Sequence, residues 1–144
     1  MKELIKTQVE VNDWEQAITE AGKLLLNCGS ITEKYIENMI NSVKQLGPYI
    51  VIAPYIAIAH ARPDESVFKE DISLIILKNP VEFGNKDNDP VKLVFAFAAK
   101  ENGGHLAQLA EIANVLGNEE LMNNIIASSS EEAVYNIING REVN

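Results

Sequence analysis

The chain has 144 residues, of which 47% are hydrophobic, so it can bury one substantial core, and we expect a single domain over residues 1–144. Its 12 basic and 21 acidic residues give a formal net charge of −9, which would repel a polyphosphate backbone and argues against nucleic acid as a partner. The sequence has neither an apolar run near the roughly 20 residues that cross a bilayer nor a secretory signal, so we expect a soluble, cytoplasmic protein.

The first elements expected along the chain are a strand and a helix. Residues 4–11 alternate apolar and polar side chains, which indicates a short strand at the edge of a sheet. Asp13 and Gln16 have the spacing of a helix N-cap, and the apolar residues that follow predict a helix over residues 13–27. The single cysteine, Cys28, cannot form a disulfide within the chain, and its place near the end of this helix indicates a small buried side chain.

A second helix is expected to begin near Thr32 and to be stopped by Gly47-Pro48, which cannot continue it. One of its sides carries the apolar residues Ile36, Met39, Ile40, Val43 and Leu46. Two amphipathic helices in succession indicate a packed pair.

Between residues 49 and 98 the sequence consists mainly of short apolar runs separated by turn residues, which is typical of a sheet. Short apolar runs predict strands at Tyr49–Ala53, Ile56–Ala59, Ile72–Leu77 and Val91–Ala98, with a polar turn over residues 84–90. Several runs are apolar at nearly every position, which is typical of strands buried on both faces. We therefore expect helices on both sides of the sheet.

Three more helices are predicted over residues 106–116, 118–127 and 131–139, the last of them after the serines at 128–130. The order helices, strands, helices indicates the α/β (α+β) class. We expect a single layered domain with a mixed β-sheet flanked by helices on both sides.

His60 is the leading candidate for chemistry, because its imidazole stands where the apolar run Ile56–Ala59 ends and a loop begins. A histidine with one ring nitrogen held by a hydrogen bond and the other free can act as a covalent nucleophile. We therefore hypothesise that His60 carries a phosphoryl group. The sequence supports equally a histidine that completes a core face and bonds a neighbouring carbonyl.

His105, Arg62 and Lys44 are the other candidates. His105 opens a predicted helix, where backbone N–H groups and the helix dipole favour an anion, although a histidine in a first turn is more often only solvated. Arg62 lies in the same loop as His60, and Lys44 lies near the end of the second helix. Either cation can hold phosphoryl oxygens, but a surface charge is the simpler interpretation of Lys44.

Signatures of other enzyme classes are absent from the sequence, including the P-loop, the dinucleotide glycine fingerprint, His-Glu-x-x-His and Gly-x-Ser-x-Gly. Neither histidine has a second ligand at the short spacing typical of a zinc site. Metal-assisted hydrolysis is therefore a poor second hypothesis, and a small-molecule hydrolase a remote third.

One motif consists of Gly47–Pro54, Ile56-Ala57 and His60–Pro63, and a second runs through residues 91–99 and 102–109. Together they resemble the enzyme IIA domains of the bacterial sugar phosphotransferase system (PTS), in the mannitol/fructose superfamily. The Gly-Pro-Tyr and His-Ala-Arg-Pro sequences are most similar to those of the ascorbate-type branch. The resemblance spans nearly the whole chain.

The resemblance implies that His60 accepts a phosphoryl group from the general carrier HPr and passes it to a cysteine of a cognate enzyme IIB, which serves the membrane enzyme IIC. His105 would be the second active-site histidine. In the hypothesis that His60 carries the phosphoryl group, Arg62 is a further contact to the phosphoryl oxygens. The resemblance also implies a sheet covered on both sides and no metal or organic cofactor. The transported sugar, ascorbate or a related substrate, is selected by another component.

Three positions depart from the family pattern. The family usually has glycine where Tyr55 stands and often proline where Ala59 stands, so the approach to His60 is expected to be shaped differently here. Where mannitol-type members have an arginine near the end of the second helix, this chain has Lys44, which offers no bidentate fork.

A regulatory module of the same fold is the competing hypothesis. It would be phosphorylated on His60 without onward transfer to any enzyme IIB cysteine. For a carrier, the acidic chain predicts partners that contribute basic groups and complexes that weaken as salt is added.

Overall fold

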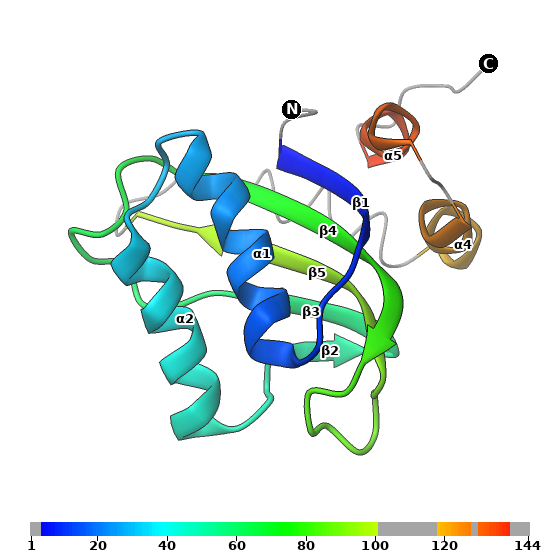
Figure 1. The fold of residues 1–144 in the computed structure, drawn as a ribbon, viewed down its shortest axis with the longest axis horizontal. Helices are drawn as coiled ribbons and strands as arrows, with labels where there is room; N and C mark the ends of the chain where they lie inside the picture. Colours follow the sequence, from blue (N-terminus) through cyan, green and yellow to red (C-terminus); the bar gives the residue numbers. More distant parts are fainter. Residues whose placement is uncertain (1–3, 101–117, 128–129, 139–144) are drawn as a thin grey trace.

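Five strands form one mixed sheet in the order β1-β4-β5-β3-β2 (Figure 1). The computed structural model describes residues 4–100, 118–127 and 130–138. The strands are β1 (Ile5–Val9), β2 (Val51–Ala53), β3 (Tyr55–Ala59), β4 (Asp71–Val81) and β5 (Val91–Ala98). The pairs β1–β4 and β3–β5 are parallel, whereas β4–β5 and β2–β3 are antiparallel. The predicted mixed sheet, with the first strand at an edge, is confirmed.

Two helices, α1 (Trp14–Asn27) and α2 (Glu33–Leu46), lie in front of the sheet in Figure 1. The predicted cap of α1 is present, because the Gln16 N–H donates to Asp13 Oδ1 at 2.8 Å. After α2 the chain turns at Gly47, whose φ of 88° lies in the left-handed region that glycine adopts without strain. The first two predicted helices are therefore confirmed.

The sheet separates two apolar clusters, because successive residues of a strand point to opposite faces. In β5, Val94 and Ala96 pack in the cluster that includes the buried faces of α1 and α2. Leu93 and Phe95 pack in the other cluster, with residues of α4 (Glu119–Ala127) and α5 (Glu131–Ile138), namely Met122, Ile125 and Val134. Helices therefore cover both faces, as the fully apolar strands predicted.

Four local predictions need correction. Tyr49 and Ile50 form a turn before β2 instead of a strand. The strand predicted to end at Leu77 continues as β4 to Val81. Cys28 is only partly buried, because it is the C-cap of α1, where the chain leaves the core. Leu46 is 72% exposed, because it lies at the border of the apolar face of α2, on the stripe that carries Ser42 one turn earlier and Asn38 two turns earlier.

The two C-terminal helices predicted at 118–127 and 131–139 are found as α4, which begins at Glu119, and α5, which is described as far as Ile138. The predicted helix over 106–116, His105 and the serines at 128–129 lie outside the described residues. No helix in the described ranges has both the length and the apolar character needed to span a membrane.

Candidate active site

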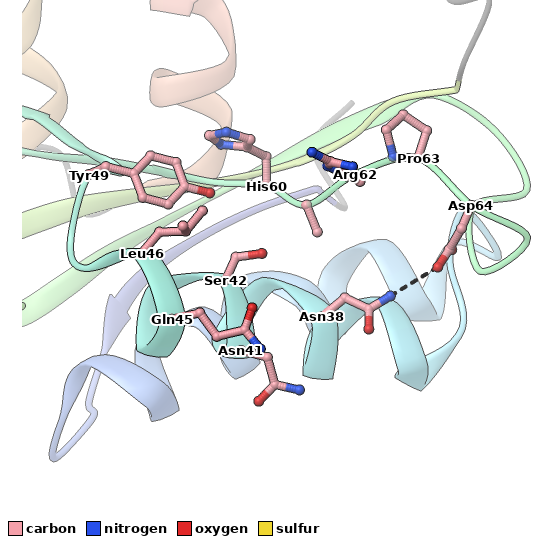
Figure 2. Close-up of a pocket in the computed structure, with 11 residues that line it drawn as sticks. Asn38, Asn41, Ser42, Gln45, Leu46, Tyr49, His60, Arg62, Pro63 and Asp64 are labelled. Carbon is pink, nitrogen blue, oxygen red and sulfur yellow. Dashed lines mark hydrogen bonds between the residues drawn. The ribbon is translucent and has the colours of Figure 1, made fainter.

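A groove of about 1000 Å³ lies between α2 and the loop that follows β3 (Figure 2). The α2 side of the groove consists of uncharged polar side chains, those of Asn38, Asn41, Ser42 and Gln45. The opposite side is the segment from His60 to Asp64, and Leu46 and Tyr49 line one end. The groove therefore brings the end of α2 and the end of β3 to one surface.

His60 projects at the point where β3 ends. Ala57 and Ala59 are fully buried, whereas His60 is exposed, so its ring does not complete a core face. Its Nδ1 lies 3.0 Å from the carbonyl oxygen of Ile58. A carbonyl oxygen can only accept a hydrogen bond, so Nδ1 carries the proton, and in the neutral ring Nε2 has the lone pair. No hydrogen bond to Nε2 comes from the described part of the chain, which leaves this nitrogen open to an electrophile.

The ring of Tyr49 packs against that of His60 in a T-shaped contact, with the centroids 5.5 Å apart and the planes at 87°. The turn that holds Tyr49 is closed by its N–H, which donates to Gly47 O at 2.9 Å. Tyr49 was predicted only as the start of a strand. The Gly47-Pro48 pair was the available signal for a turn, but sequence does not tell which ring the turn would bring to the histidine.

Arg62 lies in the groove beside His60 and is exposed (Figure 2). In the described ranges, Arg62 forms no ion pair, so its guanidinium is available to an anion. Lys44 is not in the groove: its Nζ lies 3.5 Å from Glu15 Oε1 on α1. Lys44 is therefore a surface charge, because helix periodicity places Ser42, not Lys44, on the stripe of α2 that faces the groove.

Asp64 connects the loop after β3 to α2 at the far end of the groove. It accepts hydrogen bonds from the Ser66 N–H at 2.7 Å, from the Ser66 hydroxyl, and from Asn38 Nδ2 at 3.2 Å (Figure 2). The Ser66 hydroxyl and N–H lower the pKa of Asp64, with weaker help from Lys34 and Asn38. The carboxylate therefore stays ionised near neutral pH and anchors the loop that carries His60 and Arg62.

The hairpin before His60 contains a residue in an unusual conformation. Tyr55, the first residue of β3, has φ of 73°, in the left-handed region that disfavours a side chain. This is the position at which the resemblance leads one to expect glycine, so the backbone path that glycine permits is kept by a tyrosine. Ala59 pairs with Ala96 in the parallel ladder of β3 and β5 and is fully buried.

A metal site was not expected, and no group of three or more His, Cys, Asp and Glu side chains suited to a metal occurs within the described ranges. The chemistry that these ranges offer near His60 is a nucleophilic imidazole nitrogen, one guanidinium and several neutral hydrogen-bonding groups.

The model of the family described as phosphoenolpyruvate-dependent sugar phosphotransferase system, EIIA 2, matches residues 1–140. The chain belongs to this family. Members of the family are phosphotransferases that act through a phosphohistidine, and this enzyme IIA is a phosphoryl carrier of a PTS.

This enzyme IIA is 35% identical to the ascorbate-specific PTS system EIIA component of Escherichia coli strain K12 over 135 residues, which cover 93% of this chain and 88% of the relative. Its structure is similar to that of the mannitol-specific cryptic phosphotransferase enzyme IIA CmtB from Escherichia coli, with a TM-score of 0.84 and 31% identity over 94% of this chain and 92% of CmtB. The fold is also that of the mannitol enzyme IIA of Escherichia coli in its complex with phosphorylated enzyme IIB, with a TM-score of 0.84 and 24% identity over 96% of each chain.

Proposed function

We propose that His60 is the phosphorylated residue and that it carries the phosphoryl group from HPr to a cysteine of an enzyme IIB. The observation that supports this most directly is the His60 side chain, which is exposed and bound through Nδ1 to Ile58 O, while no hydrogen bond from the described residues occupies Nε2. In the first step the bond from phosphorus to the donor imidazole of HPr breaks as a bond to His60 Nε2 forms. In the second step this bond breaks as the cysteine thiolate of enzyme IIB attacks the phosphorus.

Arg62 and His105 are proposed to bind the phosphoryl oxygens. Arg62 lines the same groove as His60 and can donate to two oxygens at once, which a lysine cannot. His105 is assigned by the family resemblance and by its predicted place at the start of a helix, where backbone N–H groups favour an anion. Transfer of this kind needs alignment and stabilisation of charge more than further covalent chemistry, so a shallow and open site is sufficient.

We also propose that residues 1–144 form one enzyme IIA domain that acts in the cytoplasm, where HPr is found, and that the system is of the ascorbate type. The named relative at 35% identity supports the choice of branch. The complex of a similar enzyme IIA with phosphorylated enzyme IIB supports enzyme IIB as the partner. The membrane enzyme IIC would be served indirectly.

The test is a reconstituted phosphorylation with phosphoenolpyruvate, the general kinase of the system and HPr. We expect an acid-labile phosphate on the wild type, none on His60→Ala, and slower labelling of His105→Ala. An acid-labile phosphate retained by His60→Ala would show that another residue is used. Adding an ascorbate-type enzyme IIB should then remove the label. A label that stays on His60 with every enzyme IIB would favour the regulatory module instead.

A further inference from the structure

Tyr35 reaches from α2 through the core to the backbone beside His60. Its side chain is fully buried, and its hydroxyl oxygen lies 2.6 Å from the carbonyl oxygen of Phe97 in β5. The same oxygen accepts the N–H of Ala61 at 3.1 Å, and the Ala61 carbonyl oxygen lies 3.3 Å away. The hydroxyl has one proton, and the shorter distance assigns it to Phe97. One side chain therefore joins α2, β5 and the residue that follows His60.

This junction lies where direct pairing of β3 and β5 stops. The last pair of the parallel ladder is Ala59 with Ala96, and β5 continues to Ala98 whereas β3 ends. Beyond the last pair, the Tyr35 hydroxyl bridges Phe97 of β5 and Ala61 of the loop. It therefore extends the connection between the two chain segments by one residue in β5 and by two residues after β3.

We infer that Tyr35 is a positioning residue for His60. By binding the Ala61 N–H, its hydroxyl holds the peptide plane between His60 and Ala61, and this plane sets how the His60 side chain leaves the backbone. The ring orientation in which Nδ1 reaches Ile58 O, so that Nε2 keeps the lone pair, depends on the orientation of this peptide plane. The inference rests on the proposed role of His60 as phosphoryl acceptor.

The hydroxyl is suited to this role because it stays protonated. The pKa of Tyr35 is raised to about 12, chiefly by burial; the Ala61 N–H opposes this rise, and Asp64 and Tyr49 contribute to it. At neutral pH the group therefore both donates to Phe97 and accepts from Ala61. A phenylalanine would fill the same volume and make neither bond.

The experiment compares Tyr35→Phe with a matched control, Ser73→Ala. Ser73 is also buried, and its hydroxyl donates to Ala21 O at 2.7 Å, but it joins β4 to α1 away from the groove. Each variant deletes one buried hydroxyl group. Transfer from phospho-HPr is measured in a single turnover, and ¹⁵N NMR of the unphosphorylated protein reports the tautomer and mobility of the His60 ring. Urea unfolding shows that both variants are folded.

We expect Tyr35→Phe to slow the transfer on the order of tenfold to a hundredfold, since small misplacements of a reacting group have effects of this size. We also expect its His60 ring to lose the single tautomer protonated on Nδ1. Ser73→Ala should match the wild type in both measurements. Equal transfer rates in the two variants would overturn the inference, and so would slow transfer by Tyr35→Phe with unchanged His60 ring signals.

A further measurement does not need a folded variant. In the wild type, the Ala61 amide should exchange with solvent as slowly as the amides in the middle of β5, although it lies in a loop. Fast exchange at Ala61 would overturn the inference. Both NMR measurements are made without a phosphoryl donor, so they remain decisive if the proposed function fails, which would appear as a wild type that HPr does not label.

Discussion

Tyr49 and His60 meet edge to face, and they come from different parts of the chain. Tyr49 lies in the turn between α2 and β2, and His60 follows β3, yet their ring centroids are 5.5 Å apart (Figure 2). The imidazole is restrained by one hydrogen bond, to Ile58 O, and by one aromatic contact, with Tyr49. The catalytic candidate is therefore held by its neighbours while its ring stays accessible.

Replacing Tyr49 should reduce phosphorylation by loosening the His60 ring. An aromatic pair of this geometry stabilises one orientation by about 0.5–1.5 kcal/mol, which corresponds to about a twofold to tenfold loss of rate in Tyr49→Ala. Tyr49→Phe keeps the ring and serves as the control, with a rate close to that of the wild type. Initial rates of labelling by phospho-HPr measure both. A loss of the same size in both variants would assign the effect to the hydroxyl.

Removing the Arg62 guanidinium should slow labelling of His60 by about tenfold or more, because a hydrogen bond to a charged group contributes about 1.5–3 kcal/mol. Lys44→Ala is the matched control, since it removes the same charge from a side chain that pairs with Glu15 outside the groove. We expect Lys44→Ala to leave the rate unchanged. Two variants that lose activity equally would indicate a general effect of net charge on the encounter with HPr.

Tyr55→Gly should be more stable than Tyr55→Ala by about 1 kcal/mol. Both variants lose a ring that is 48% exposed, but only glycine relieves the left-handed φ of 73°. The greater freedom of glycine in the unfolded chain offsets part of this gain. Urea unfolding of the two variants measures the difference. Equal stabilities would mean that the backbone at this position relaxes to another conformation.

Gly22→Ala should destabilise the protein, because the new Cβ would lie 2.7 Å from Ile36 Cγ1, where α1 packs on α2. Such overpacking costs about 1–3 kcal/mol and outweighs the gain of about 0.5–1 kcal/mol from replacing glycine in a helix. In an Ile36→Ala background the clash is absent, and Gly22→Ala should become neutral or stabilising. The double-mutant cycle is read from urea unfolding, and an identical effect in both backgrounds would refute the packing explanation.

The stability of the wild type should fall between pH 10 and pH 12 relative to Tyr35→Phe. Burial raises the pKa of Tyr35 from 10.0 to about 12, so the stabilisation is fully present below pH 10 and is lost as the pH rises through the higher value. In this range the unfolded chain has released the phenolic proton and the folded chain has not. The difference between the two proteins should change by about 1.4 kcal/mol per pH unit, measured by urea unfolding. Lysines titrate in both proteins, so their effect cancels in the difference. If the free energies of unfolding of the two proteins changed in parallel with pH, the raised pKa of Tyr35 would be contradicted.

Much of the fold could be predicted from local pattern. The alternation at the first strand, the Asp13 cap, the stop at Gly47-Pro48 and the apolar strands each act over a few residues, and each is found in the structure. Leu46 was wrongly placed on the apolar side of the second helix. It lies at the edge of that side, and only the packing of the helix against the sheet decides whether a residue at the edge is buried. Cys28 was misjudged for the same reason, at the end of α1.

The class of fold, the two covered faces of the sheet and the candidacy of His60 all follow from the amino-acid pattern alone. These depend on hydrophobic periodicity and on the type of one side chain, which can be read without coordinates. The three-dimensional arrangement was needed to show that the His60 ring is exposed with Nδ1 bound to Ile58 O, that Ser42 and not Lys44 faces the groove, and that the Tyr35 hydroxyl binds Ala61. The groove and the Tyr35 hydrogen bonds join α2 to β5 and to the segment after β3, which are distant in the chain, and the exposure of the His60 ring depends on what packs around it.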